Sequence, residues 1–196
     1  GIVSDNRYGL YHPGLPSALI THQLRPVAPG GLSFAGWAAG RWLQNRVSCF
    51  DEVWIPDEEP GSIRFEFGTL SGRLSIPVVN STKVKYAGLL SRFKPDEIKS
   101  AQAESNYSLL VVASGISPQR EKLIQMAAEW VRSYQVKAAW ILPEDADRRM
   151  LYPEQTTVFV SPDDSSFLKL VNESDCILSR PGYSALSDWL VLNRGA

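Results

Sequence analysis

The sequence predicts an α/β protein made of two Rossmann-like lobes, each a parallel sheet flanked by helices. In the second half, short apolar runs alternate with helical stretches, as a parallel sheet with crossover helices requires. Glycine-containing turns follow two of these apolar runs. A polar and charged stretch separates two apolar blocks. We therefore expect a first lobe at residues 1–92, a linker at residues 93–105 and a second lobe at residues 106–196.

The composition favours a globular protein of the cytoplasm. The chain has 196 residues, of which 44% are hydrophobic, and a net charge of −1, which argues against a nucleic-acid partner. No apolar run is long enough to span a membrane, and no signal peptide is visible. We expect Cys49 and Cys176 to be reduced, buried and unbonded thiols. His12 and His22 are too few for a histidine-based metal site, and we expect no metal.

Both ends of the sequence look cut. Residues 2–3 begin as a strand without a lead-in, and the chain stops at residues 193–196, where an α/β unit would turn into its next strand. We therefore expect both lobes to be incomplete.

The first lobe opens with two strands that each end in a polar cluster. Residues 2–3 lead into Asp5, and the strand at residues 17–21 leads into His22. Sites in open α/β sheets form at the carboxyl ends of strands, so these clusters are candidates for chemistry. The alternative is a pair of solvated turns, with Asp5 capping a helix.

A helix is expected at residues 34–47, where Trp37 and Trp42 fall on one side and two arginines accompany them. One interpretation packs both indoles on the core; the other presents an aromatic and basic face to a membrane surface. The rest of the lobe comprises a strand at residues 50–55, an acidic loop at 57–61, a turn-rich loop at 70–74 and a strand at 84–89.

The second lobe begins with a continuous apolar run at residues 107–113, typical of a strand buried on both faces. Pro118 favours a helix start, and an apolar stripe extends that helix over residues 119–134. The remaining elements are strands at 136–142, 156–160 and 176–179 and helices at 165–172 and 183–192. We interpret Asp163-Asp164 as a helix cap, and residues 145–147 as a solvated loop, rather than as metal ligands.

Two glycine turns, at Gly115 and Gly182, join a strand to a helix. Such a turn leaves backbone N–H groups and the positive end of the helix dipole facing an anion, and glycine lets a ligand approach closely. The dinucleotide fingerprint GxGxxG is absent. An ordinary strand-turn-helix is the alternative for each turn taken alone.

The order of these motifs resembles that in the GT-B glycosyltransferases of family 28, typified by the N-acetylglucosaminyltransferase of peptidoglycan-precursor synthesis. Residues 180–188 read RPGYSALSD, which is similar to the family's RSGxxTxxE with Asp188 in place of glutamate. Residues 21–23 (THQ), 88–92 (GLLSR) and 114–117 (SGIS) resemble its other motifs in part. The runs SDNRYG and LSGRLS look like an uncharacterised bacterial branch. The family's first glycine-rich loop would precede residue 1, and its glutamine motif would follow residue 196.

The resemblance implies a metal-independent hexosyltransferase that moves a sugar from a nucleotide-activated donor, with a UDP-sugar as the first candidate, to an unknown acceptor, for which a lipid-linked sugar is one candidate. It implies no cofactor, and its place would be the cytoplasm or the inner membrane face. The alternatives are a nucleotide-sugar-binding or regulatory module without catalysis and a sugar-nucleotide epimerase of the same fold. The nucleotide-sugar candidates are Arg92, Ser114, Gly115, Arg180, Gly182, Ser184 and Asp188.

The required chemistry assigns roles to these residues. Negative charge builds on the pyrophosphate as the sugar leaves, and Arg92 or Arg180 with the helix N-termini can neutralise it. Asp188 can accept both ribose hydroxyls. His22 is the natural general base for the acceptor hydroxyl, and Asp5 is the competing candidate.

Overall fold

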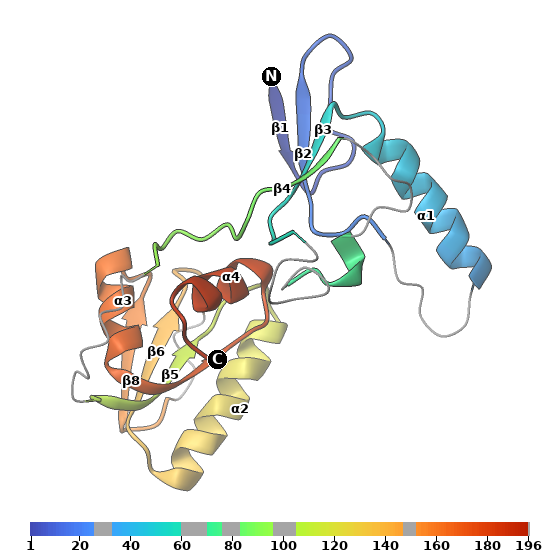
Figure 1. The fold of residues 1–196 in the computed structure, drawn as a ribbon. Helices are drawn as coiled ribbons and strands as arrows, with labels where there is room; N and C mark the ends of the chain where they lie inside the picture. The colour runs from blue at the N-terminus through green and yellow to red at the C-terminus, as the bar shows by residue number, and fades with distance from the viewer. Residues whose placement is uncertain (26–32, 60–69, 76–82, 96–104, 147–151, 196) are drawn as a thin grey trace. The chain divides into compact units, whose positions relative to one another are not determined.

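The computed structural model describes residues 1–25, 33–59, 70–75, 83–95, 105–146 and 152–195 (Figure 1). It contains two four-stranded sheets, all of whose strand pairs are parallel, so the expected α/β class with flanking helices is confirmed. The chain divides into two compact units, Gly1–Leu90 and Ser91–Ala196, and each is described by itself below.

The first unit is a sheet with strand order β1-β2-β3-β4. Its core is small: Val53 and Ile55 are fully buried with Leu24, and Val47, Val84 and Tyr86 pack against them. Because all four strands run the same way, their carboxyl ends share one edge. The elements are β1 (Ile2–Asp5), β2 (Ser17–Ile20), α1 (Ser33–Val47), β3 (Glu52–Ile55), the short 3-10 helix η1 (Arg73–Ser75) and β4 (Val84–Tyr86).

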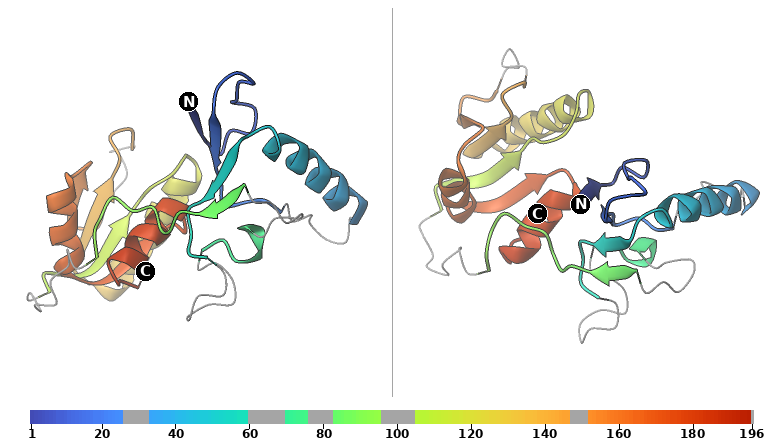
Figure 2. Two further views of the ribbon diagram at one scale, coloured as in Figure 1. Left: turned by 45° about the horizontal axis from the view of Figure 1, so that its top comes forward. Right: turned by 90° about the horizontal axis from the view of Figure 1, so that it is seen from above.

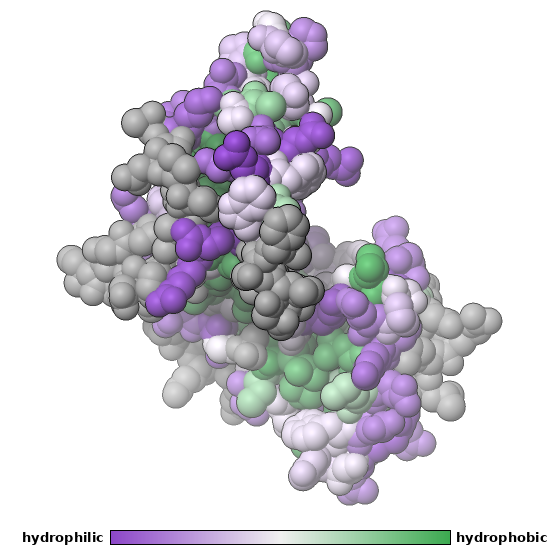
Figure 3. Space-filling view, turned by 90° about the vertical axis from the view of Figure 1, so that its right-hand side faces the viewer, coloured by the Kyte–Doolittle hydropathy of each residue, from purple (hydrophilic) through white to green (hydrophobic). Residues whose placement is uncertain are grey.

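Helix α1 extends beyond the sheet of its own unit, with Leu43 buried on it (Figure 2). Trp37 and Trp42 are 63% and 55% exposed, so of the two interpretations of this helix the one that packs both indoles on the core is wrong. The Trp42 ring instead contacts Tyr8 and lies beneath the guanidinium of Arg46. Figure 3 looks onto the side of this unit that carries α1, where hydrophilic and weakly polar residues predominate.

The second unit has three layers. Its sheet has the order β7-β6-β5-β8, with α2 on one face and α3 and α4 on the other (Figure 2). Residues alternate along β5: Leu109 and Val111 face α2, whereas Leu110 and Val112 face α3 and α4. The elements are β5 (Tyr107–Val112), α2 (Gln119–Tyr134), β6 (Ala138–Leu142), β7 (Thr156–Val160), α3 (Asp164–Asn172), β8 (Ser174–Ser179) and α4 (Tyr183–Val191).

This strand order contains a topological switch point. The chain proceeds from β5 outward through β6 to β7 and then returns to place β8 on the other side of β5. The connections after β5 and β8 therefore diverge to opposite faces of the sheet, and in open α/β sheets the resulting crevice is where ligands bind.

Two sequence expectations need correction. The residues expected as linker start inside the second unit, where Phe93 is 5% exposed and stacks on Phe167. Cys49 and Cys176 are unbonded, as expected, but both are exposed rather than buried. Each thiol follows or lies within an apolar segment, and adjacency in sequence does not fix on which side of the backbone it emerges. Residues 96–104 of the expected linker lie outside the described residues.

Replacing Phe93 by alanine tests this boundary. We expect Phe93→Ala to lower the free energy of unfolding by about 3–5 kcal/mol, because it leaves a cavity between the rings of the second unit. Leu90→Ala, only three residues earlier but at a half-exposed position, should change it by about 0.5 kcal/mol or less. Urea unfolding of the whole chain measures both, and equal effects would contradict the assignment.

Candidate functional site

The two glycine turns lie next to each other at the switch point. Val112, at the end of β5, is paired with Ser179, at the end of β8, so the turns that follow start from neighbouring positions. Helix α2 begins after the first turn, with Pro118 as its N-cap, and α4 begins after the second, with Gly182. Neither cap supplies a side-chain hydrogen bond. The first N–H groups of two helices are thus gathered at one edge, and the carboxylate of Glu121 lies in the first turn of α2, where hydrogen bonds to its own backbone N–H and to Ser117 lower its pKa.

Gly115 permits a close approach of the Arg180 side chain to the backbone. Its φ is +91°, a backbone conformation that L-residues with a side chain rarely adopt. A Cβ atom there would overlap with Nη1 of Arg180. The guanidinium of Arg180 therefore lies directly over the Gly115 backbone.

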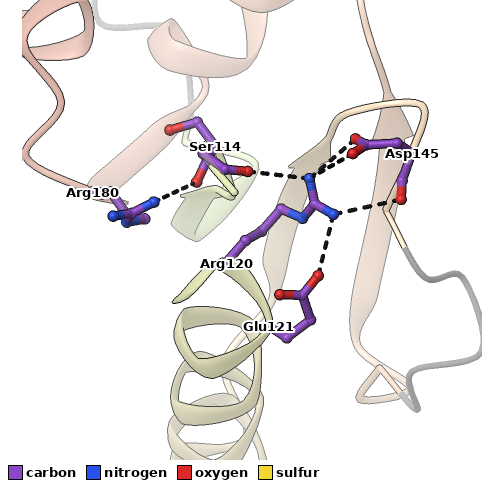
Figure 4. Close-up of polar contacts among 6 residues, drawn as sticks. Ser114, Arg120, Glu121, Asp145 and Arg180 are labelled. Carbon is purple, nitrogen blue, oxygen red and sulfur yellow. Dashed lines mark hydrogen bonds and ion pairs between the residues drawn. The ribbon is translucent and has the colours of Figure 1, made fainter. Parts of the chain in front are cut away.

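Arg180 is held there by neutral acceptors. Its Nη2 donates to Oε1 of Gln119 at 2.6 Å. Its Nη1 lies 3.5 Å from the carbonyl oxygen of Ser114 (Figure 4). Among the residues that the structure describes, no carboxylate forms an ion pair with Arg180. Its positive charge is consequently available to an anion at the switch point.

A second arginine, Arg120, lies at this site, although it is not among the candidates that the sequence motifs indicate. It is 5% exposed, and its Nη1 donates to the carbonyl oxygen of Gly115 at 3.2 Å and to the carboxylate of Asp145 at 3.0 Å (Figure 4). Its Nη2 donates to Oε1 of Glu121 at 3.2 Å. Burial acts to lower the pKa of Arg120, but the carboxylates of Asp145 and Glu121 outweigh it and raise the pKa.

Arg120 fastens the turn after β5 to the loop after β6, and two carboxylates compensate its charge. The sequence does carry a signal for it. Arg120 precedes Ile124 by four residues and Ala127 by seven, so it stands on the buried stripe of α2. A charged residue on such a stripe implies a partner of opposite charge, and Asp145 is that partner; its side chain is 77% exposed, so it lies in a solvated loop as expected and also pairs with Arg120.

Asp188, in α4, lies next to Arg92, which belongs to the segment that opens the second unit. Oδ1 of Asp188 accepts from the Ser91 hydroxyl at 2.6 Å, and Oδ2 lies 3.4 Å from Nε of Arg92. Arg92 also pairs with Asp164 at 2.9 Å and stacks on the rings of Phe93 and Phe167. Both carboxylate oxygens of Asp188 are therefore engaged. Ser184, in the first turn of α4, is exposed.

In the first unit, Asp5 and His22 lie at the shared carboxyl edge. Asp5 ends β1 in register with Ile20, two residues before His22. Burial lowers the pKa of His22, and the negative charge of Asp5 partly opposes that shift. No helix follows β1 in the described stretch 6–25, so Asp5 does not cap one there. The two candidate bases thus interact electrostatically.

A hydrogen-bond network surrounds this pair. The Tyr8 hydroxyl lies 2.8 Å from Oγ1 of Thr21 and donates to the carbonyl oxygen of Gln23 at 2.9 Å. Oγ1 of Thr21 donates to Oδ1 of Asn6 at 3.0 Å. Burial raises the pKa of Tyr8, with an opposing effect from its bond to Thr21. The network fixes the residue that precedes His22.

The acidic residues considered as metal ligands have other roles. Asp163 accepts from the backbone N–H of Ser166 at 2.7 Å and caps α3, as expected, and these bonds lower its pKa. Within the described ranges, no three or more His, Cys, Asp or Glu side chains are grouped so that they could hold a metal ion. None of the helices in those ranges has the length and apolarity needed to cross a membrane.

No protein-family model, curated protein or solved structure matches the chain.

Substituting Gly115 tests the close approach of Arg180. We expect Gly115→Ala to cost about 1–3 kcal/mol of stability, because the residue keeps a positive φ and its methyl group displaces Arg180. Gly182→Ala is the matched control. The φ of Gly182 is −73° and a Cβ there would meet nothing, so the loss of stability should come only from alanine being a poorer N-cap, about 1 kcal/mol or less. Thermal unfolding of both variants makes the comparison, and equal losses would refute it.

The pKa of His22 can be measured by NMR titration of its imidazole, assigned with a His12→Asn variant. We expect a value below the ordinary 6.5, and a lower one in Asp5→Asn, because the opposing carboxylate charge is gone. Since the unfolded chain then binds the proton more tightly, His22 contributes stability fully above pH 6.5, and this is lost as the pH falls through its folded pKa. A pKa at or above 6.5 would contradict the burial of this ring.

Proposed function

We propose that the protein is a glycosyltransferase that moves a hexosyl group from a UDP-sugar to a hydroxyl acceptor, with the nucleotide held by the second unit. The observation that carries this proposal is the uncompensated guanidinium of Arg180 over Gly115, between the starts of α2 and α4. A diphosphate suits a place with one free positive charge and two sets of helix N–H donors.

The two arginines have different roles in this proposal: Arg180 binds the diphosphate, and Arg120 fixes the turn at Gly115. Arg180 exchanges the amide oxygen of Gln119 and the carbonyl of Ser114 for phosphate oxygens, which bind a guanidinium more strongly than neutral acceptors do. Arg120 is itself buried and already donates to the carboxylates of Asp145 and Glu121, so a phosphate would have to displace two anionic acceptors there rather than neutral ones. It holds the Gly115 turn while Arg180 binds the ligand. Ser114, Gly182 and Ser184 supply further polar atoms at the same edge.

The chemical step follows from these roles. The bond between the anomeric carbon and the phosphate oxygen breaks, and the leaving UDP takes the electron pair while Arg180 and the helix N-termini stabilise its charge. The acceptor oxygen forms the new bond to the anomeric carbon and loses its proton to a base. His22 fits this task because its lowered pKa keeps it neutral at pH 7. No metal is required.

Asp188 can still bind the ribose in this scheme. The Ser91 hydroxyl donates one hydrogen bond to Oδ1, and a ribose hydroxyl would donate one in its place, so the exchange conserves the bond. Arg92 stays paired with Oδ2 throughout. In the absence of the ligand, the Ser91 hydroxyl therefore makes the hydrogen bond that the ribose hydroxyl would make.

The architecture supports the GT-B part of the proposal, since two units with parallel sheets are what that fold class requires. The exposed Trp42 and the neighbouring arginines of α1 support a further part, contact of the first unit with a lipid-linked acceptor at an anionic membrane surface. A protein that binds UDP but transfers no sugar would be a binding module instead, and one that inverts the donor sugar without an acceptor would be an epimerase.

Calorimetric titration with UDP tests the nucleotide site. We expect Arg180→Ala to weaken binding roughly tenfold to hundredfold, because a charge-assisted hydrogen bond contributes about 1.5–3 kcal/mol. Lys137→Ala is the charge-matched control: Lys137 precedes β6 at the opposite edge of the same sheet and contacts Tyr107, so UDP affinity should not change. Absence of UDP binding by the wild-type protein would sink the proposed function.

A further inference from the structure

Asp57 is a buried carboxylate to which the proposed reaction gives no role. It follows β3 at the carboxyl edge of the first unit and has no exposed surface. Its carboxylate accepts hydrogen bonds from the backbone N–H groups of Glu58 at 2.8 Å, Leu70 at 3.1 Å and Ser71 at 2.8 Å. The Ser71 hydroxyl adds a bond of 2.5 Å. A buried charge needs such donors, and here two adjacent residues of a distant loop provide three of them.

The bound loop, residues 70–75, reaches onward to the chain after β2. The hydroxyls of Ser71 and Ser75 lie 2.7 Å apart, and that of Ser75 is 3.4 Å from the Tyr86 hydroxyl. The carbonyl oxygen of Leu74 accepts from the N–H groups of Leu24 at 2.7 Å and Arg25 at 3.0 Å. Asp57 therefore holds the loop, and the loop holds residues 24–25.

His22 lies between two fixed points as a result. On one side Thr21 is fully buried and bonded to Asn6 and Tyr8; on the other, Leu24 is buried and bonded to Leu74. Only His22 and Gln23 lie between them. The backbone that carries the imidazole is thus fixed at both ends, and one end depends on Asp57 through the loop.

We propose that Asp57 is a positioning residue for His22, acting through the loop at residues 70–75. The inference rests on the proposed role of His22 as the general base, because that role gives the position of the ring its importance. Asp57 touches no reacting atom; it fixes the loop that bonds to residues 24–25, just after the base. A base displaced by about 1 Å loses much of its rate advantage, since proton transfer needs hydrogen-bond reach to the acceptor hydroxyl.

The variant Asp57→Asn separates positioning from volume. Its amide keeps the size of the side chain but replaces one acceptor oxygen by an NH₂ group, which then faces the N–H donors of residues 70–71. Asp51→Asn is the matched control. Asp51 likewise accepts from a serine, through the N–H of Ser17 at 2.7 Å and its hydroxyl at 3.1 Å, but it precedes β3 at the opposite edge of the same sheet.

The experiment titrates the His22 imidazole by NMR in the full chain and follows its modification by diethyl pyrocarbonate. In Asp57→Asn we expect the pKa of His22 to rise toward its ordinary 6.5, because burial is what lowers it, and the modification rate to increase severalfold. Asp51→Asn should leave both values unchanged. Ser71→Ala, which removes only the hydroxyl bonds, should produce a smaller change in the same direction and replaces Asp57→Asn if that variant does not fold.

A folded Asp57→Asn protein with an unchanged His22 titration and modification rate overturns the inference, as does an equal effect of Asp51→Asn. UDP affinity, measured on the same variants, should stay at the wild-type value because the nucleotide candidates belong to the second unit. If the wild type binds no UDP, the proposed function fails, whereas the His22 readouts still decide whether Asp57 positions this ring.

Discussion

The parallel pairing of β5 with β8 is the constraint on which the second unit depends. It places the last strand in the sequence beside the first strand of the same sheet, and so brings two turns separated by more than sixty residues to adjacent positions. Neither turn alone distinguishes a ligand site from an ordinary connection. Together they provide two helix starts, a glycine that admits close approach and an arginine that spans both. The pairing also sends α2 and α4 to opposite faces, which leaves the edge between them uncovered by a helix.

Much of the second unit was predictable because its signals are local. The bounds of α2 and β7 agree with the expected ones, since a strong apolar stripe after Pro118 defines the former and a β-branched run defines the latter. The candidate turns were also found in the sequence. The partners of the site residues were not: Arg120 meets Asp145 across 25 positions, and Ser91 meets Asp188 across 97. Such pairs arise from topology, which periodicity does not encode.

The first unit shows the limits of composition more clearly. A helix rich in tryptophan predicts burial by its apolar content, yet the structure leaves Trp37 and Trp42 largely exposed. An acidic stretch predicts solvent exposure, yet Asp57 has none, because the donors that satisfy it come from a loop 13 and 14 positions away. In both cases the side chain's environment is decided by which segment the sheet places beside it, and a residue's own polarity is a weak guide.

The bond between Ser91 and Asp188 also concerns the boundary of the two units, because Ser91 directly follows Leu90. Any hydroxyl that takes Oδ1 of Asp188 releases the first residue of the second unit from α4. Linkage is reciprocal, so tension or rearrangement at that boundary must change the affinity of α4 for such a hydroxyl by the same free energy. Arg92, the next residue, stays paired with Oδ2, so the exchange would free the Ser91 side chain while the segment that opens the second unit stays attached to α4.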